Sequence, residues 1–231
     1  MPKNIVFEDL GLMDYQQAWD YQELLFQQLL SSKGKSTAGS TANAGNLLFV
    51  EHPHVYTLGK SGSPENLLVN EAFLQSKGAS FYHINRGGDI TYHGPGQLVG
   101  YPILDLDALC IGVREYVFRL EEVVIQCLKQ YNIEGGRLGG ASGVWLGADI
   151  TGLSRKICAI GVRASRAVTM HGFAFNINTD LSFYNHINPC GFTDKGVTSL
   201  QKESGSVMDM KLLKNRMKES FEAVFDIKLL A

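Results

Sequence analysis

The stretch that most constrains the fold of this chain is residues 86–97, which read RGGDITYHGPGQ. It combines four glycines and a proline with an arginine and a histidine. The largely apolar residues 81–84 and 98–103 flank it, and both segments are typical of strands. We therefore predict a loop that a sheet holds at both ends. Glycines let backbone N–H groups approach a ligand, so this loop is a candidate binding site; the alternative is a plain glycine-rich hairpin.

Two further blocks lie later in the chain. Residues 155–162 and 170–178 read as two strands that a short polar turn connects, and the sequence NPCG follows at 188–191. The proline and glycine that flank Cys190 place it in a turn, which can present a thiol to a cleft. The ordinary expectation for a cysteine is a buried structural thiol. Lys156 lies among strand-forming residues, where a lysine usually protects the edge of a sheet.

Together, Cys190 and Lys156 would suit an acyl transfer. A free thiol is only a few per cent thiolate at neutral pH, and an adjacent ammonium group lowers the pKa of that thiol. Transfer of an acyl group from a thioester to an amine needs such proton management, and it needs donors for the developing oxyanion. The two residues are therefore a candidate nucleophile and its activating cation.

The composition argues against several classes of function. A formal net charge of −2 supplies no general basic field for nucleic acid or an anionic membrane. Four cysteines without C-x-x-C spacing predict neither a disulfide framework nor a zinc site, and the six histidines have no ligand-spaced partners. The glycine-rich loop matches neither G-x-x-x-x-G-K-[ST] nor G-x-G-x-x-G. We therefore predict no metal and no cofactor.

Periodicity predicts a mixture of strands and helices. Strand-like alternation at residues 4–9 precedes an amphipathic helix that Asp14 can cap, and amphipathic helices are also predicted at 113–131 and 208–225. Residues 31–46, which read SSKGKSTAGSTANAGN, lack apolar anchors and are predicted to be a flexible surface loop. The fold class expected is α+β.

Length and hydropathy predict one domain in the cytoplasm. The 231 residues, of which 45% are hydrophobic, can bury a core of ordinary size, so residues 1–231 are expected to form a single domain. No apolar run approaches the roughly 20 residues that span a bilayer. Residues 1–8 lack the apolar region of a signal peptide.

Four blocks, in order, carry a resemblance to a known family. They read R-G-G-x-x-T-Y-H-G-P-G-Q, K-I-x-A-I-G-V, H-G-x-A-x-N and N-P-C-G, within residues 51–200. The chain closely resembles the lipoyl(octanoyl) transferases, the octanoyltransferases that make protein-bound lipoate. This resemblance implies the catalytic-domain fold of the biotin and lipoate protein ligases, in which helices flank a mixed and largely antiparallel sheet.

The resemblance also implies a reaction and its partners. Octanoyl would pass from octanoyl-acyl carrier protein to Cys190 as a thioester, with Lys156 activating the cysteine and without ATP. The group would then move to the lysine ε-amine of a lipoyl domain, in the first step of endogenous protein lipoylation. The implied acceptors are the lipoyl domains of 2-oxoacid dehydrogenase complexes and the H protein of glycine cleavage. Neither nucleic acid nor membrane is implied as a partner.

The resemblance places the substrate in the glycine-rich loop and the two later strands. The implied substrate-binding residues are Arg86, Gly87, Gly88, Asp89, Ile90, Thr91, Tyr92, His93, Ala159, Ile160, Gly161, Gly172, Phe173 and Ala174. By residue type, Ile160, Val162 and Phe173 are candidates for an apolar slot that holds the acyl chain. His93 is a candidate for orienting a group or relaying a proton.

Other polar residues near these blocks have open roles. His52 and His54, in the block E-H-P-x-V-Y-T-x-G, would be either walls of the acyl pocket or hydrogen-bonded structural histidines. Arg155, Arg163 and Arg166 would form a basic docking face for acidic partner domains.

Two alternative functions stay open. An ATP-dependent lipoate or biotin protein ligase would share the fold and a glycine-rich loop, but it would form an acyl-adenylate and would not need a nucleophilic cysteine. A noncatalytic protein that binds acyl carrier protein would keep the fold without turnover.

Overall fold

A mixed sheet forms the centre of the molecule. The computed structural model describes residues 2–33, 44–148, 150, 152–188 and 195–230. Three strand pairs in the sheet are parallel, β12–β1, β1–β2 and β11–β9, and the other pairs are antiparallel. The strands lie in the order β12 (Ile227–Leu230), β1 (Lys3–Leu12), β2 (Gly45–Glu51), β6 (Gln97–Leu104), β10 (Val168–Asn176), β9 (Arg155–Ser165), β8 (Ala141–Leu146) and β7 (Gly136–Leu138), with β11 (Gly196–Val197) beside β9.

A second, three-stranded sheet and the helices complete the fold. The small sheet has the order β4 (Ser80–His83), β3 (Val55–Leu58) and β5 (Ile90–His93). The helices are α1 (Tyr15–Ser32), α2 (Glu71–Ser76), α3 (Val113–Lys129), α4 (Leu200–Ser204) and α5 (Met210–Phe225), and the 3₁₀ helices are η1 (Pro64–Asn66) and η2 (Leu181–His186). The predicted α+β class, with a mixed and largely antiparallel sheet between helices, is confirmed.

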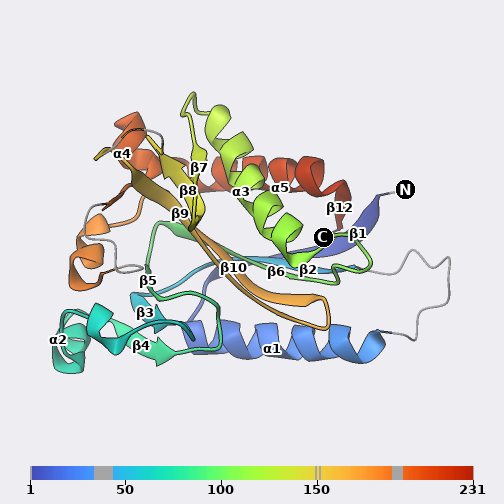
Figure 1. Cartoon of the computed structure of the whole chain (residues 1–231), viewed down its shortest axis with the longest axis horizontal. Helices are drawn as coiled ribbons and strands as arrows, with labels where there is room; N and C mark the ends of the chain where they lie inside the picture. The colour runs from blue at the N-terminus through green and yellow to red at the C-terminus, as the bar shows by residue number, and fades with distance from the viewer. Residues whose placement is uncertain (1, 34–43, 149, 151, 189–194, 231) are drawn as a thin grey trace.

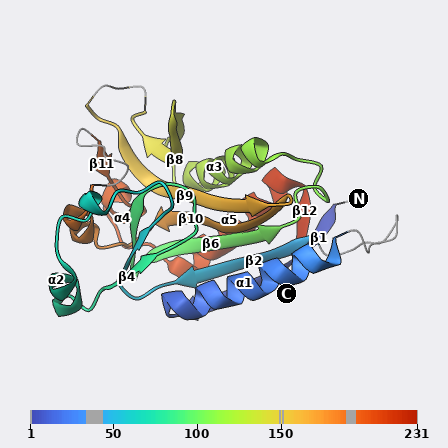
Figure 2. The same cartoon turned by 60° about the horizontal axis from the view of Figure 1, so that its bottom comes forward.

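Helices cover both faces of the large sheet. Helix α1 lies along one face, and α3 and α5 lie on the other (Figures 1 and 2). On the first face Ala18 and Phe26 pack into a cluster with the sheet residues Leu48 and Tyr101. The second face holds the larger cluster, in which α3 and α5 meet the opposite sides of β2, β6, β9 and β10. The layers bury apolar side chains on both sheet faces, which explains the nearly unbroken apolar runs of β2 and β6.

The N-terminal helix begins where the sequence predicts. Asp14 accepts hydrogen bonds from the backbone N–H groups of Gln16 and Gln17, at 2.9 and 3.3 Å. These bonds satisfy two amides that have no partner within the helix. The side chains that α1 buries recur every three or four residues, and they include Gln22. The first turn of the helix thereby places Tyr15 against the end of the sheet, where the cavity described below lies.

The glycine-rich run differs from its prediction in two respects. Residues 90–93 form strand β5, so the run is not one continuous loop. The strands on either side, β4 and β6, belong to different sheets. The run therefore crosses from the small sheet to the large one. Its strand was missed because β5 has only four residues between glycine-rich turns, which hides the alternation.

The predicted surface loop at residues 31–46 is too long at both ends. Helix α1 extends through Ser32, and β2 begins at Gly45, whose neighbour Ala44 is buried. Residues 34–43 lie outside the described residues. Ser31 and Ser32 lie in the last turn of the helix, where their hydroxyls donate to carbonyls three residues earlier. Strand β12, which extends the sheet beyond β1, was not predicted at all.

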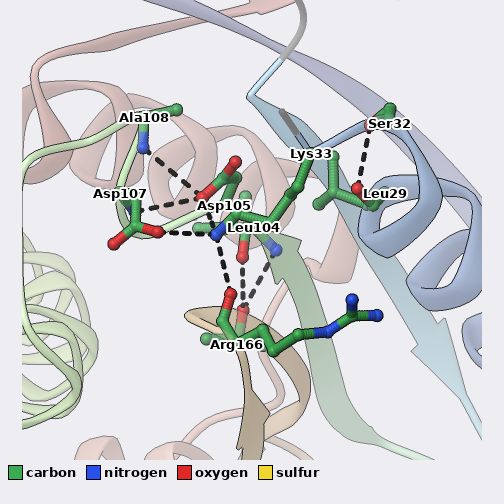
Figure 3. A network of polar contacts seen from close by, with 9 residues as sticks. Leu29, Ser32, Lys33, Leu104, Asp105, Asp107, Ala108 and Arg166 are labelled. Carbon is green, nitrogen blue, oxygen red and sulfur yellow. Dashed lines mark hydrogen bonds and ion pairs between the residues drawn. The ribbon is translucent and has the colours of Figure 1, made fainter. Parts of the chain in front are cut away.

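Lys33 connects three elements at the far end of the sheet (Figure 3). Its ammonium group lies 2.8 Å from carboxylate oxygens of both Asp105 and Asp107, and it donates to the carbonyl oxygen of Arg166 at 2.7 Å. Asp105 follows β6, and Arg166 lies in the turn between β9 and β10. Lys33 therefore connects the end of α1 with the end of β6 and with the turn between β9 and β10.

Candidate active site

A cavity of ≈ 510 Å³ follows the antiparallel pair β9–β10. Its β9 wall consists of Lys156 and residues 159–162, and its β10 wall consists of residues 171–174 and Asn176. Since Cys158 opposes Phe175 and Val162 opposes His171 in this pair, Lys156 and His171 lie at opposite ends of the wall. The volume is within the range of small-molecule sites.

The cavity brings together the residues that the sequence blocks suggest. Lys156 lines it, and so do all but one of the predicted substrate-binding residues. Those in the wall are Arg86, Gly87, Gly88, Asp89, Ile90, Thr91, His93, Ala159, Ile160, Gly161, Gly172, Phe173 and Ala174. Val162 also lines the cavity, so the three candidates for an apolar slot share one site.

Tyr92 is the exception. In β5 its side chain points away from the cavity wall and is fully buried in the core of the small sheet, among Tyr56 and Phe183. Its hydroxyl lies 2.7 Å from Nδ1 of His54. Alternation along the strand turns Tyr92 away from the side on which its neighbours Thr91 and His93 line the cavity, and Ile90, at the start of the strand, touches both the cavity and the core of the small sheet.

Backbone contacts join the glycine-rich run to β9. The N–H of Gly87 donates to the carbonyl of Val162 at 3.1 Å. The contact is so close that a Cβ atom on Gly161 would lie 2.6 Å from Nη1 of Arg86. Arg86 in turn donates to the carbonyls of Gly87 and Asp89, at 2.8 and 2.6 Å. The arginine therefore folds the loop, and the glycines let it lie against the strand.

Lys156 lies inside the sheet and not on a free edge. β9 has β8 on one side, where Trp145 opposes Lys156, and β11 on the other, where Val197 opposes it. The ammonium nitrogen lies 4.6 Å from the centre of the Trp145 ring, a cation–π contact. The edge-protection alternative is therefore wrong, and the lysine side chain belongs to the cavity wall.

The cysteines that the structure describes do not serve as nucleophiles in the cavity. Cys127 and Cys158 are buried; burial raises the pKa of Cys127 to about 12 and also raises the pKa of Cys158. Cys110 is exposed and does not line the cavity. Cys190, the predicted nucleophile, lies in residues 189–194, outside the described part of the chain.

Hydrogen bonds establish the tautomer of His93. Asn176 donates through Nδ2 to the carbonyl of Thr198, so its Oδ1 faces Nε2 of Gln97 at 2.9 Å. Gln97 Nε2 also donates to the carbonyl of Tyr92, which leaves Gln97 Oε1 to accept from His93 Nδ1 at 2.7 Å. Burial lowers the pKa of His93 to about 3. A neutral ring with an unprotonated Nε2 can accept a hydrogen bond and so orient a donor group of the substrate. Its low pKa makes it too weak a base for the proton relay considered above.

His52 and His54 are structural. His52 bonds to the carbonyl of Met13 at 2.8 Å and to the hydroxyl of Tyr101 at 2.7 Å, and burial lowers its pKa to about 4. The His54 ring stacks on Phe183 with ring centres 4.1 Å apart. Neither histidine lines the cavity.

Two of the three arginines of the predicted basic docking face are paired with acidic side chains. Arg155 makes two charged hydrogen bonds to Glu203, at 2.7 and 2.6 Å, and Arg163 pairs with Glu23 at 3.1 Å. Arg155 begins β9, and Arg166 follows its end, so the two lie on the order of 30 Å apart. Two of the three charges are thus paired within the protein, and the separation of Arg155 from Arg166 argues against a single compact basic patch.

Several wall residues were not predicted. They include Tyr15, Val99, Tyr101, Val117, residues 140–142, His171, Asn176, Tyr184 and Val197. The signal for His171 and Asn176 was available, because both stand at fixed positions of the H-G-x-A-x-N block. The tyrosines come from α1, β6 and η2, and no spacing in the sequence connects them with the glycine-rich run.

Helices in the described part of the chain are too short or too polar to cross a membrane. Within that same part, no three histidine, cysteine, aspartate or glutamate side chains gather as metal ligands would.

Comparisons with known proteins agree with this architecture. The family model for the lipoyl protein ligase A/B catalytic domain matches residues 14–222. An octanoyltransferase of Flavobacterium johnsoniae is 57% identical over 207 residues, which are 89% of each chain. An octanoyltransferase of Parabacteroides distasonis is 52% identical over 219 residues, covering 95% of this chain and 97% of that one.

Solved structures share the fold at low sequence identity. A bipartite lipoate protein ligase from Thermoplasma acidophilum superposes with a TM-score of 0.68 at 14% identity, covering 99% of this chain and 86% of that one. A biotin protein ligase from Aquifex aeolicus gives a TM-score of 0.51 at 12% identity, covering 98% and 70%. With the family model and close relatives over nearly the whole chain, this protein belongs to the octanoyltransferases of the lipoyl protein ligase A/B catalytic-domain family.

Proposed function

We propose that the protein transfers octanoyl from octanoyl-acyl carrier protein to the lysine ε-amine of a lipoyl domain, through a thioester on Cys190. The Cys190 thiolate attacks the donor carbonyl, the carbon–sulfur bond to the carrier breaks, and the carrier thiol leaves with a proton. The deprotonated amine of the acceptor then attacks the Cys190 thioester. An amide forms, and the cysteine sulfur leaves as a thiolate.

The position of Lys156 is the observation that carries this proposal. The lysine stands at one end of a cavity whose wall between the two ends includes Ala159, Ile160 and Phe173. Burial against such an apolar wall stabilises an alkyl chain. The ammonium group at the end of the cavity can act on a carbonyl or a thiol. A cavity built only to bind a chain would have no need of a cation inside the sheet.

The chain that follows Cys190 supports a role for the cysteine beside Lys156. Val197, seven residues after the cysteine, is the strand partner of Lys156, and the N–H of Thr198 donates to the Lys156 carbonyl at 2.9 Å. In this reaction Lys156 favours the Cys190 thiolate by its charge. It also exchanges protons with the departing carrier thiol and the attacking amine.

The acceptors and the cellular location are part of the proposal. The relatives are octanoyltransferases, and the Thermoplasma ligase is described together with its E2 lipoyl domain. Both support lipoyl domains as acceptors, namely those of 2-oxoacid dehydrogenase complexes and the H protein of glycine cleavage. We place the reaction in the cytoplasm.

Intact mass spectrometry after incubation with octanoyl-acyl carrier protein tests the proposal. We expect one octanoyl adduct on the wild-type protein without any nucleotide. The adduct should be absent from Cys190→Ala and present in Cys127→Ala, because Cys127 is buried and its pKa is raised. Adding a lipoyl domain should remove the adduct and increase the mass of that domain.

The same experiment separates the two alternatives. Strict dependence on ATP, with AMP released, would identify a ligase that works through an acyl-adenylate. Binding of acyl carrier protein without an adduct or turnover would identify a noncatalytic protein. An adduct that persists in Cys190→Ala would overturn the assignment of the nucleophile.

A further inference from the structure

The His171 end of the cavity is closed by buried polar side chains. Tyr15 and Tyr101 are each 3% exposed, and His171 is 1% exposed. All three line the cavity, whereas the exposed residues Gly88 and Ser142 lie on its rim. The cavity therefore has an open side and a blind, polar end.

The backbone at His171 departs from regular strand geometry. Its φ is +62°, a left-handed value that residues other than glycine seldom adopt. The β6–β10 pairing ends at Phe173 opposite Gly100, and Pro102 in β6 has no N–H to continue it. The N–H of His171 donates instead to Oε1 of Gln22 on α1, at 3.1 Å. This local break opens the sheet and lets the imidazole enter the cavity wall.

The two ring nitrogens of His171 differ in their hydrogen bonds. Nε2 lies 2.8 Å from Oδ1 of Asn85, so Nε2 carries the proton and Nδ1 is an acceptor. Burial first, and then the charges of Arg86 and Arg163, lower the pKa of His171 to about 3, so the ring is neutral. Nδ1 is buried and has no hydrogen-bond partner among the described residues. Buried polar atoms are nearly always paired, and one ordered water is a common partner.

We propose that a water molecule bound to Nδ1 of His171 ends the apolar slot and sets the longest acyl chain that the site accepts. The proposal rests on the octanoyl transfer proposed above. Lys156 and Val162, the strand partner of His171, are six residues apart, or roughly 20 Å along β9. This span is an upper bound on the length of the slot, because the side chains of Lys156 and His171 occupy part of it. A chain that reaches the imidazole displaces the water and leaves Nδ1 buried against methylene groups without a partner.

Chain-length profiles test the proposal. Transfer to a lipoyl domain is measured with octanoyl-, decanoyl- and dodecanoyl-acyl carrier protein, and the ratio of kcat/KM for octanoyl over dodecanoyl is compared. In His171→Leu we expect this ratio to fall about tenfold or more, because leucine has no polar atom to leave unpaired. His171→Asn should keep the wild-type ratio, since asparagine retains polar atoms and tolerates the left-handed backbone.

Val162→Ala is the matched control for added space. It enlarges the same end of the cavity and leaves His171 in place. If Val162→Ala lowers the ratio as much as His171→Leu does, space and not polarity limits the chain, and the proposal fails. An unchanged ratio in His171→Leu also overturns it.

Binding of free fatty acids gives a readout that does not depend on transfer. In calorimetry, dodecanoate should bind the wild-type protein no more tightly than octanoate, and it should bind His171→Leu more tightly. A wild-type affinity that rises steadily with chain length, as an open apolar slot requires, contradicts the proposal. This assay needs no nucleophile. Its result can therefore be interpreted even if Cys190 proves not to carry the acyl group.

Discussion

At the scale of single residues, the face of the strand on which a charged side chain lies decides what it contacts, even for neighbours in the sequence. Lys156 and Arg155 are neighbours in β9, yet Arg155 is held by Glu203 while Lys156 lines the cavity over Trp145. Successive residues in a strand face opposite sides, so one of two adjacent cations serves the fold and the other serves the site.

Substitution of Lys156 separates its charge from its proton transfer. In Lys156→Ala, alkylation of Cys190 by iodoacetamide should rise with pH about one unit or more later than in the wild type, because the thiolate loses its cation. Lys156→Arg should keep most of the low thiol pKa but transfer octanoyl poorly, since a guanidinium does not exchange protons near neutral pH.

The measurement is the pH profile of alkylation, read as mass added at Cys190, alongside the rate of octanoyl transfer. Lys202→Ala, which removes a lysine that does not line the cavity, is the control and should leave the alkylation profile in place. An alkylation profile in Lys156→Ala identical to that of the wild type would show that the two side chains are not coupled.

At the scale of elements, one carboxylate on α3 holds the hairpin β7–β8. Glu121 accepts from the N–H of Gly143 and from Nε of Arg137, both at 3.0 Å. Gly143 has a φ of +115°, and a Cβ atom there would lie 2.4 Å from the carbonyl oxygen of Cys158. The glycine lets β8 lie close to β9, and Glu121 holds it there. Residues 140–142 of this hairpin line the cavity.

Loss of the Glu121 carboxylate should therefore weaken both the fold and the site. We expect Glu121→Ala to lower the free energy of unfolding by about 2 kcal/mol, because the buried Gly143 amide and Arg137 lose their acceptor. Octanoyl transfer should also slow, since the cavity wall loses its support.

Urea unfolding and transfer kinetics check this prediction against Glu115→Ala. Glu115 is on the same helix and makes an exposed pair with Arg119, so its loss should cost about 0.5 kcal/mol or less. Equal effects of the two substitutions would mean that Glu121 does not hold the hairpin.

At the scale of the whole molecule, the fold keeps three histidines neutral in its interior. Burial lowers the pKa of His52 to about 4 and those of His93 and His171 to about 3. All three lie where α1 and the small sheet meet the large sheet, and each bonds to a different segment of the chain. The stability of this junction therefore depends on pH.

The sign of the dependence follows from proton binding. An unfolded histidine titrates near pH 6.5, so between pH 6.5 and 4 the unfolded chain binds more protons than the native protein does. The contribution of each histidine to the free energy of unfolding is therefore fully present above pH 6.5. As the pH decreases below this value, the contribution falls by about 1.4 kcal/mol per pH unit for each histidine. Urea unfolding at pH 7.5, 6 and 5 measures this slope.

Two variants check the origin of the slope. His171→Asn should reduce it by about one third, because one of three titrating groups is removed. His83 is exposed, so His83→Gln should leave it as it is. A free energy of unfolding that stays constant from pH 7.5 to 5 would contradict the neutral interior.

Local sequence was sufficient for the α+β class and for the pair β9–β10, whereas most of the predicted cavity wall came from the family resemblance. Helix periodicity and the Asp14 cap depend on residues close in the sequence, so the sequence alone predicts them. The glycines at 87, 88 and 161 indicate that the backbone makes a close contact there, but not with which segment. The motif blocks also singled out Lys156, whose side chain lines the cavity.

Long-range packing was needed for everything that depends on which elements meet. The hydrogen bond from Gly87 to Val162 joins the two sheets, and no periodicity encodes it. Tyr92 turned out to face the core of the small sheet because the register of β5, hidden between glycines, sets its direction. The blind end at His171 exists because a helix, a proline in β6 and a left-handed residue in β10 meet at one point, and such a meeting is a property of the folded chain.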